Sequence, residues 1–207
     1  RPGETGCLTG RGHPVQALLA VSRAIDAVTG FIGHHIRWLI LAAVLVSAIN
    51  AIIRKLFDVS SNAWLELQWY LYGAVFMMAA AYVLRCNGHV RIDVVSSRLS
   101  ARTREWIDLF CHIVMLLPLV VVMVWLSFPF VIESYQDQEI SMNAGGLIIW
   151  PSKLFILLGF VLLLFQAISE IIKRIGFLTG ALTEPEPEAA TGGLSPEDLG
   201  VTGDRRE

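Results

Sequence analysis

The chain has 207 residues, of which 55% are hydrophobic and only 16% are charged, and its formal net charge is −2 at pH 7. A soluble domain carries roughly 25% charged residues, so this composition excludes a disordered chain, a disulfide-stapled secreted module and a nucleic-acid binder with a basic face. The apolar residues form long blocks rather than periodic stripes, which indicates membrane spans.

The N-terminal part of the chain comes before the first of these blocks. We expect residues 1–14 to be a flexible cytoplasmic N-terminus. From Val15 to Ile32, apolar residues recur at spacings of three and four, which predicts an amphipathic helix. Arg23 and Asp26 interrupt this stretch, so it lacks the smooth apolar region of a cleavable signal peptide. We expect the helix to lie at the cytoplasmic interface or to run straight into the first span.

Four uncharged runs of 16 to 24 residues follow. With their flanks, they are long enough to cross a hydrocarbon core about 30 Å thick as helices. We therefore predict an all-α integral membrane protein whose membrane domain, residues 15–182, has spans at about 36–57, 64–85, 106–132 and 147–172. A second amphipathic interfacial helix, capped by Ser100, should lead into the third span, with a solvated basic loop as the alternative. Pro118 should kink that span by freeing the carbonyl of Val114.

Basic residues lie mainly on one side of this topology. Thirteen Lys and Arg residues fall on the side of both termini, and only Arg54, Lys55 and Lys153 fall on the other. The positive-inside rule therefore predicts a multi-pass protein with both termini in the cytoplasm. Residues 183–207 hold seven acidic and two basic residues among Pro and Gly, which predicts a disordered acidic cytoplasmic tail.

Polar side chains stand at the outer ends of the first two spans. Asn50 and Arg54 are one helical turn apart on the first span, and Glu66 lies in the first turn of the second. Because the connection between these spans is short, we predict an ion pair between Arg54 and Glu66 that clamps the two helices. A proton or substrate relay is the alternative for intramembrane charges of this kind.

A short polar pattern follows the second span directly. His89, Arg91 and Asp93 alternate with apolar residues, which favours an extended segment at the level of the lipid headgroups. Three titratable side chains on one face could form a hydrogen-bonded network with a neighbouring chain. A solvated loop is the simpler alternative.

The histidines offer a second function from a different class. His34 or His35 could pair with His112 as axial ligands of a haem between helices. The chain would then be a haem-binding or structural anchor subunit of a redox or other membrane complex. The sequence contains no Cys/His spacing typical of a metal site, and our preferred interpretation needs no cofactor, no catalytic residue and no metal.

The third connection is acidic and rich in turn residues. Gly145 and Gly146 predict a tight turn, and Pro151 suits the first turn of a helix. This loop could touch an extracytoplasmic partner or simply cap the bundle. Its candidate residues are Glu139, Ser141, Gly145, Gly146, Trp150, Pro151 and Lys153.

Taken in order, these features resemble the DctQ-like small permease subunit of tripartite ATP-independent periplasmic (TRAP) transporters. The likeness covers about residues 30–176 and departs at Leu67, where many relatives have a second acid. The motifs that carry it are Asn50…Arg54, Trp64-Leu65-Glu66, His89-Val90-Arg91-Ile92-Asp93, Glu139-Ile140-Ser141, Gly145-Gly146-Leu147, Trp150-Pro151-Ser152-Lys153 and Gly159-Phe160.

The resemblance implies a non-catalytic subunit of the bacterial inner membrane. Its partners would be a large DctM-like permease subunit, a periplasmic solute-binding protein and membrane lipids, and not nucleic acid. The large subunit would carry sodium and an organic acid-like solute, while the small subunit would form a fixed scaffold. The residues agree on one point, because four apolar helices with almost no internal charge make a poor route for an ion. Asn50, Arg54, Glu66, His89, Arg91 and Asp93 are therefore expected to be inter-helix or subunit-interface residues.

Overall fold

The computed structural model of the chain describes residues 13–58, 61–86 and 100–179. Its helices are α1 (His13–Phe57), α2 (Asn62–Arg85), α4 (Ala101–Cys111), α5 (Leu117–Gln136) and α6 (Trp150–Leu178), with a π-helical turn η1 (His112–Leu116) joining α4 to α5. The described residues form no strand, and Ile140 and Ile148 make an isolated antiparallel bridge. The expected acidic tail and the candidates His89, Arg91 and Asp93 lie outside the described residues.

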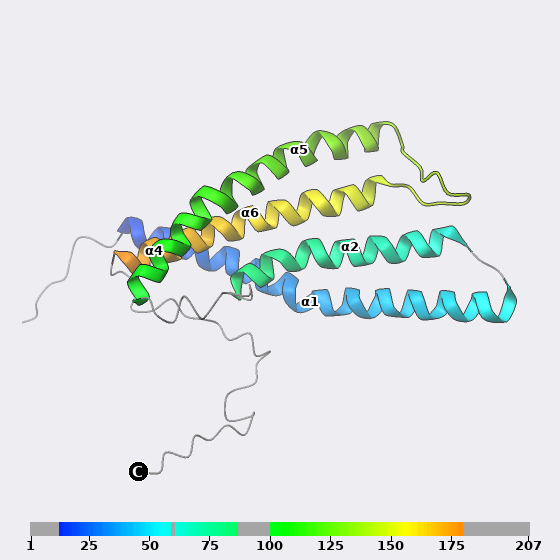
Figure 1. Cartoon of the computed structure of the whole chain (residues 1–207), viewed down its shortest axis with the longest axis horizontal. Coiled ribbons are helices and arrows are strands. Elements are labelled where there is room, and N and C mark those ends of the chain that lie inside the picture. Colours follow the sequence, from blue (N-terminus) through cyan, green and yellow to red (C-terminus); the bar gives the residue numbers. More distant parts are fainter. Residues whose placement is uncertain (1–12, 59–60, 87–99, 180–207) are drawn as a thin grey trace, which may run out of the picture.

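Four helical stretches are long and apolar enough to cross a membrane, namely Leu18–Phe57, Asn62–Arg85, Arg102–Gln136 and Trp150–Leu178. They confirm the expected all-α membrane fold. Consecutive stretches run in opposite directions, so α1 begins and α6 ends at one end of the molecule (Figure 1). We call this the terminal end. The α1–α2 connection and the 137–149 loop, which joins α5 to α6, lie at the opposite end, the loop end.

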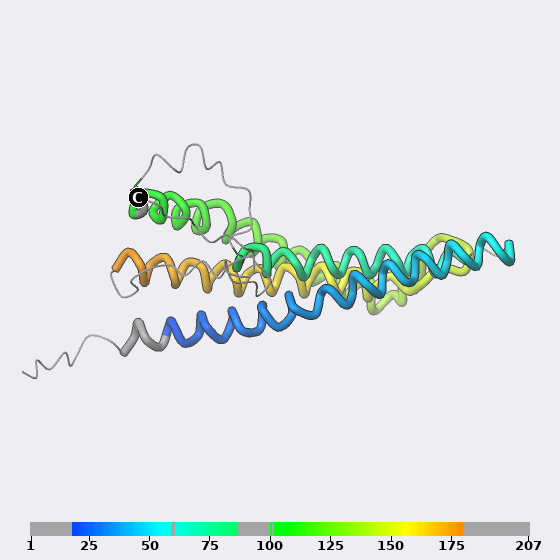
Figure 2. Tube along the Cα trace, turned by 90° about the horizontal axis from the view of Figure 1, so that it is seen from below, coloured from blue at the N-terminus to red at the C-terminus, as the bar shows by residue number. Residues whose placement is uncertain are grey.

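The N-terminal amphipathic segment runs straight into the first span, which was one of its two expected arrangements. Together they form one helix of 45 residues, which is about 67 Å long and far exceeds a hydrocarbon core of about 30 Å. At the terminal end, α6 lies between the first half of α1 and α4 (Figure 2). Asp58, with a φ of 55°, ends α1 in the left-handed conformation that Asp tolerates.

The second interfacial helix, α4, begins as expected. Ser100 is its N-cap, and the Ser100 Oγ accepts a hydrogen bond of 3.2 Å from the Thr103 N–H. The helix continues into α5 through η1, where the Leu117 N–H donates to the carbonyl of His112. Pro118 lies directly after this π turn and has no N–H of its own. The green ribbon changes direction between α4 and α5 (Figure 1), so the third span bends at a π turn beside the expected proline.

Small residues let the helices approach one another closely. A Cβ on Gly159 of α6 would lie 2.9 Å from the backbone oxygen of Met77 on α2, and one on Gly33 of α1 would lie 2.2 Å from the Tyr82 ring. Large apolar side chains point outward instead; Phe76 is 75% exposed and Trp125 is 79% exposed. Tight packing through small residues and an apolar outer surface are both typical of membrane helices.

Candidate functional site

At the loop end, the buried carboxylate of Glu66 anchors the 137–149 loop to the first turns of α2. Glu66 Oε1 accepts hydrogen bonds from the Ser141 hydroxyl and, at 2.8 Å, from Asn143 Nδ2. Glu66 Oε2 accepts one of 2.6 Å from the Leu147 N–H. Three donors from one loop therefore converge on a single side chain that is only 7% exposed.

This arrangement corrects one expectation. Glu66 does join two parts of the chain, but its partners are in the 137–149 loop, and it forms no ion pair with Arg54 within the described residues. The loop donors already occupy both carboxylate oxygens, so Glu66 needs no cation from α1. The sequence could not reveal this choice because the three donors lie 75 to 81 residues further along the chain.

The rest of the 137–149 loop is built around this anchor. The Ser141 N–H donates to the Leu147 carbonyl at 3.0 Å, and Gly145 turns the chain with a φ of 71°. A Cβ on Gly146 would lie 2.9 Å from Glu66 Oε1, so glycine is required there for the close approach. Asn62 Nδ2 adds a bond of 3.0 Å to the Ala144 carbonyl. The predicted tight turn at Gly145 and Gly146 therefore lies directly over the start of α2.

A second carboxylate fixes the base of the same loop. Glu139 forms an ion pair with Lys153 in the first turn of α6, and the Ser134 hydroxyl donates a hydrogen bond of 2.6 Å to it. Bonds from Lys153 and Ser134 hold the pKa of the Glu139 carboxyl below its usual range. The Lys153 ammonium also lies 4.0 Å from the centre of the Phe130 ring.

The first two residues of α6 support the base of the loop as well. The Trp150 ring packs edge-on against Tyr135 of α5, with 5.5 Å between the ring centres. Pro151 occupies the first turn of α6, where its missing N–H costs no helical hydrogen bond. All seven loop candidates predicted from the sequence are thus brought together at the loop end.

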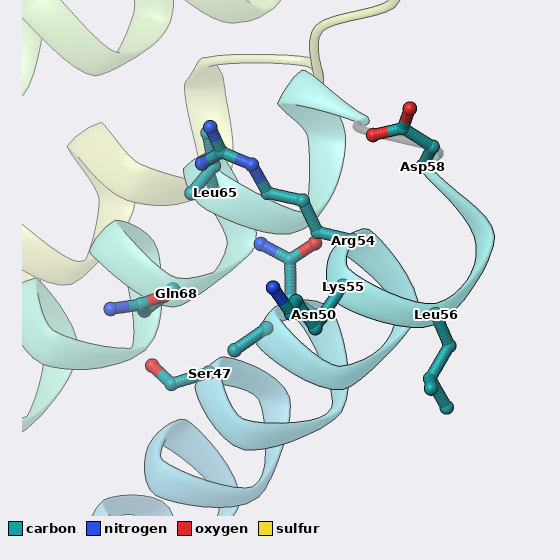
Figure 3. A pocket seen from close by; sticks show the side chains of 9 residues that line it. Ser47, Asn50, Arg54, Lys55, Leu56, Asp58, Leu65 and Gln68 are labelled. Carbon is teal, nitrogen blue, oxygen red and sulfur yellow. The ribbon is translucent and has the colours of Figure 1, made fainter.

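Asn50 and Arg54 line a separate feature, an open groove between α1 and α2 (Figure 3). The groove has a volume of about 810 Å³. Within the described part of the chain, Asn50 and Arg54 form no hydrogen bond through their side chains and no ion pair. The lining residues are Ser47, Asn50, Ala51, Arg54, Lys55, Leu56, Asp58, Leu65 and Gln68.

The terminal end holds an ion-pair cluster that we did not predict from the sequence. Arg174 of α6 is 4% exposed, and its Nη1 lies 2.8 Å from Glu170 Oε2. The same guanidinium lies 3.7 Å from a Glu105 oxygen and 3.8 Å from an Asp108 oxygen, both on α4. The one available signal was the spacing of four between Glu170 and Arg174, which is typical of a helical ion pair. This cluster ties α4 to α6.

A neighbouring polar cluster ties α1 to α6. The Ser22 and Ser169 hydroxyls are 2.7 Å apart. Asp26 accepts bonds of 2.8 Å from Gln166 Nε2 and 3.0 Å from Ser169 Oγ, and it lies 3.1 Å from Lys173 Nζ. Asp26, which interrupted the apolar stretch in the sequence, thus lies on the face that packs against α6.

The histidines considered as haem ligands each contact their own helix. The Arg37 guanidinium contacts the His34 ring, His35 Nδ1 lies 2.8 Å from the Phe31 carbonyl, and His112 Nδ1 lies 2.6 Å from the Asp108 carbonyl. Among the described residues, no group of three or more His, Cys, Asp or Glu side chains could hold a metal ion.

Comparison with known families adds one match. The model of a family described as tripartite ATP-independent periplasmic transporters, DctQ component, matches residues 43–176. The matched region is well over half of the chain and contains Glu66, the 137–149 loop and all but the last residues of α6. We found no match among curated proteins or solved structures.

Proposed function

Because the chain belongs to the DctQ component family of TRAP transporters, we propose that this small membrane subunit is a non-catalytic scaffold for a large DctM-like permease subunit. In this role the chain itself carries neither sodium nor solute. It holds the large subunit in the membrane while that subunit moves an organic acid-like solute, delivered by a periplasmic solute-binding protein and coupled to sodium.

The observation that carries this proposal is the charge-free middle of the bundle. Residues 38–53, 67–84, 109–132 and 154–169 contain no Asp, Glu, Lys or Arg, and the helices that hold them pack side by side (Figure 1). Charged side chains within membrane spans mark the pathways of ions and charged solutes, and these stretches have none. These helices instead offer an apolar surface for lipid and for a partner.

The two ends of the bundle support a rigid scaffold. Glu66 and Glu139 tie the 137–149 loop to α2 and α6 at the loop end. Arg174 and Asp26 tie α6 to α4 and α1 at the terminal end. Because polar contacts join the helices at both ends, the bundle should keep its shape while the large subunit moves against it.

The proposed setting is the bacterial inner membrane with both termini in the cytoplasm. The terminal end would then face the cytoplasm and the loop end the periplasm. Thirteen of the sixteen basic residues support this orientation by the positive-inside rule. The 137–149 loop would be presented toward the binding protein, with the Met142 side chain fully exposed at its tip.

Co-expression with the large permease subunit of the same transporter tests the proposal. We expect affinity-tagged chain to retain that subunit through detergent extraction and size-exclusion chromatography. A tagged membrane protein of similar size from another family serves as the control for non-specific capture. A chain that is well folded by circular dichroism but elutes without the large subunit would contradict the proposed function.

A further inference from the structure

We propose that the groove between α1 and α2 receives a transmembrane helix of the large permease subunit that carries an acidic side chain near its periplasmic end. This inference rests on the proposed function and adds the contact surface and its chemistry. The groove lies at the loop end and opens to the outside of the bundle (Figure 3).

The polar side chains of the groove form a row along one face of α1. Ser47, Asn50 and Arg54 follow one another at spacings of three and four residues, which places them on the same side of the helix. Gln68 faces this row from α2 (Figure 3). Arg54 extends from α1 toward Leu65, so its guanidinium spans the mouth of the groove.

These polar groups have no partner among the described residues of the chain. The Ser47 hydroxyl is buried and makes no hydrogen bond to any of those residues. The side chains of Asn50, Arg54 and Gln68 make no hydrogen bond or ion pair within residues 13–58, 61–86 and 100–179. Glu66, two residues before Gln68, accepts three hydrogen bonds. The fold therefore supplies hydrogen-bond donors to the buried Glu66 carboxylate, and none of the described residues pairs with the polar groups of the neighbouring groove.

The depth of the row distinguishes a protein partner from a lipid. Counting back from Phe57, where α1 ends, Asn50 lies about 10 Å and Ser47 about 15 Å down the helix axis. With the outer edge of a hydrocarbon core about 30 Å thick placed at Phe57, the end of the predicted first span, these positions lie toward the middle of the bilayer. A lipid phosphate could reach Arg54 but would lie too far out for Asn50. Polar side chains at two levels of another membrane helix would satisfy both.

The charge of the groove identifies the chemistry of that helix. Arg54 and Lys55 bring two positive charges, and the one acidic lining residue, Asp58, holds its carboxylate away from the Arg54 guanidinium (Figure 3). A carboxylate on the partner would pair with Arg54 at the mouth. An amide or hydroxyl one turn deeper would pair with Asn50 and Gln68.

Site-specific photocrosslinking tests the location. A photoreactive residue at Ala51, which lines the groove, should crosslink to the large permease subunit in the intact complex in native membranes. The matched control is Ile49, which is 45% exposed on α1 and does not line the groove. A complex that assembles normally but crosslinks only at Ile49, or only to lipid at Ala51, would overturn the groove proposal and leave the proposed function standing.

Substitution tests the chemistry. Asn50→Leu and Arg54→Met remove polar groups that have no partner in the described part of the chain, so the thermal stability of the isolated chain should be unchanged or higher. The affinity for the large subunit should fall by about tenfold or more, because the partner's carboxylate would lose its cation in Arg54→Met and its amide or hydroxyl would lose its hydrogen-bond partner in Asn50→Leu. Gln136→Leu, at the exposed end of α5, is the control and should change neither quantity.

The two measurements separate the possible failures. Lower stability of the isolated variants, with the affinity intact, would make the row an internal structural feature and overturn the inference. If the unaltered chain does not bind the large subunit, the proposed function fails first and the inference fails with it.

Discussion

Glu66 and Glu139 show how single charged residues act in this apolar chain. Each carboxylate accepts hydrogen bonds from groups on other elements, Glu66 from the 137–149 loop and Glu139 from Ser134 of α5 and Lys153 of α6. Both are satisfied within the chain and neither faces lipid unpaired. Their common consequence is a loop with a defined shape at the end proposed to face the periplasm.

Glu66→Gln should release the 137–149 loop. The amide would place an NH₂ group among three donors, from Ser141, Asn143 and Leu147, so at least one donor would lose its acceptor. We expect faster hydrogen–deuterium exchange in peptides covering residues 139–149, and in particular at the Leu147 amide. Glu133→Gln, at an exposed position of α5, is the control. Unchanged exchange in the Glu66 variant would refute the anchoring role.

The contact made by Glu139 should depend on pH. Because its folded-state pKa is lowered by Lys153 and Ser134, its contribution to stability is fully present above the unfolded pKa of Glu, about 4.3. That contribution is lost as the pH falls through the lower folded-state pKa. The difference in thermal stability between wild type and Glu139→Gln should therefore be largest at about pH 7 and shrink on acidification below about pH 4.3. A difference that grows on acidification would contradict this account.

At the scale of the helices, the packing of α2 against α6 depends on a close approach at Gly159. A Cβ there would lie 2.7 Å from the Met77 Cβ and 2.9 Å from the Met77 carbonyl oxygen. Gly159→Ala should therefore destabilise the chain by about 1–3 kcal/mol, as overpacking of a core does. At Gly73 nothing lies within 4 Å of the added Cβ, so Gly73→Ala should be neutral or stabilising. Equal unfolding midpoints for the two variants in detergent would disprove the close-packing argument.

The attachment of α4 to α6 depends on Arg174. Arg174→Met would remove the guanidinium that lies beside Glu105 and Asp108 of α4, whereas Glu170 would keep its ion pair with Lys173. Lys173→Met is the milder control, because the Lys173 side chain is 27% exposed. We expect faster amide exchange throughout α4 in the Arg174 variant alone. The same response from both variants would mean that α4 is held by other contacts.

The elements and the site differ in how far the sequence predicted them. The four spans followed from the uncharged runs, because charged side chains are costly in lipid and a helix satisfies its own backbone hydrogen bonds there. The prediction of an ion pair between Arg54 and Glu66 was wrong, because it relied on their closeness along the chain. The actual donors to Glu66 come from the 137–149 loop, 75 to 81 residues away. The Arg174 cluster was missed for the same reason, because its partners Glu105 and Asp108 are distant in sequence.

At the scale of the whole molecule, the polar groups sort into two classes. Those that tie elements together, such as Glu66 and Glu139 at the loop end and Arg174 at the terminal end, have partners within the chain. Those of the groove, Asn50, Arg54 and Gln68, have none within the described residues. This division, together with the charge-free middle of the spans, supports the proposed role of a rigid subunit that works in a complex.

The most direct test of the scaffold role is uptake into proteoliposomes that contain defined components. The solute bound by the transporter's own binding protein, in radiolabelled form, is offered under an inward sodium gradient. The account predicts uptake when this chain, the large permease subunit and the binding protein are all present, and none when this chain is reconstituted alone or with the binding protein. Sodium-driven uptake by this chain without the large subunit would contradict it.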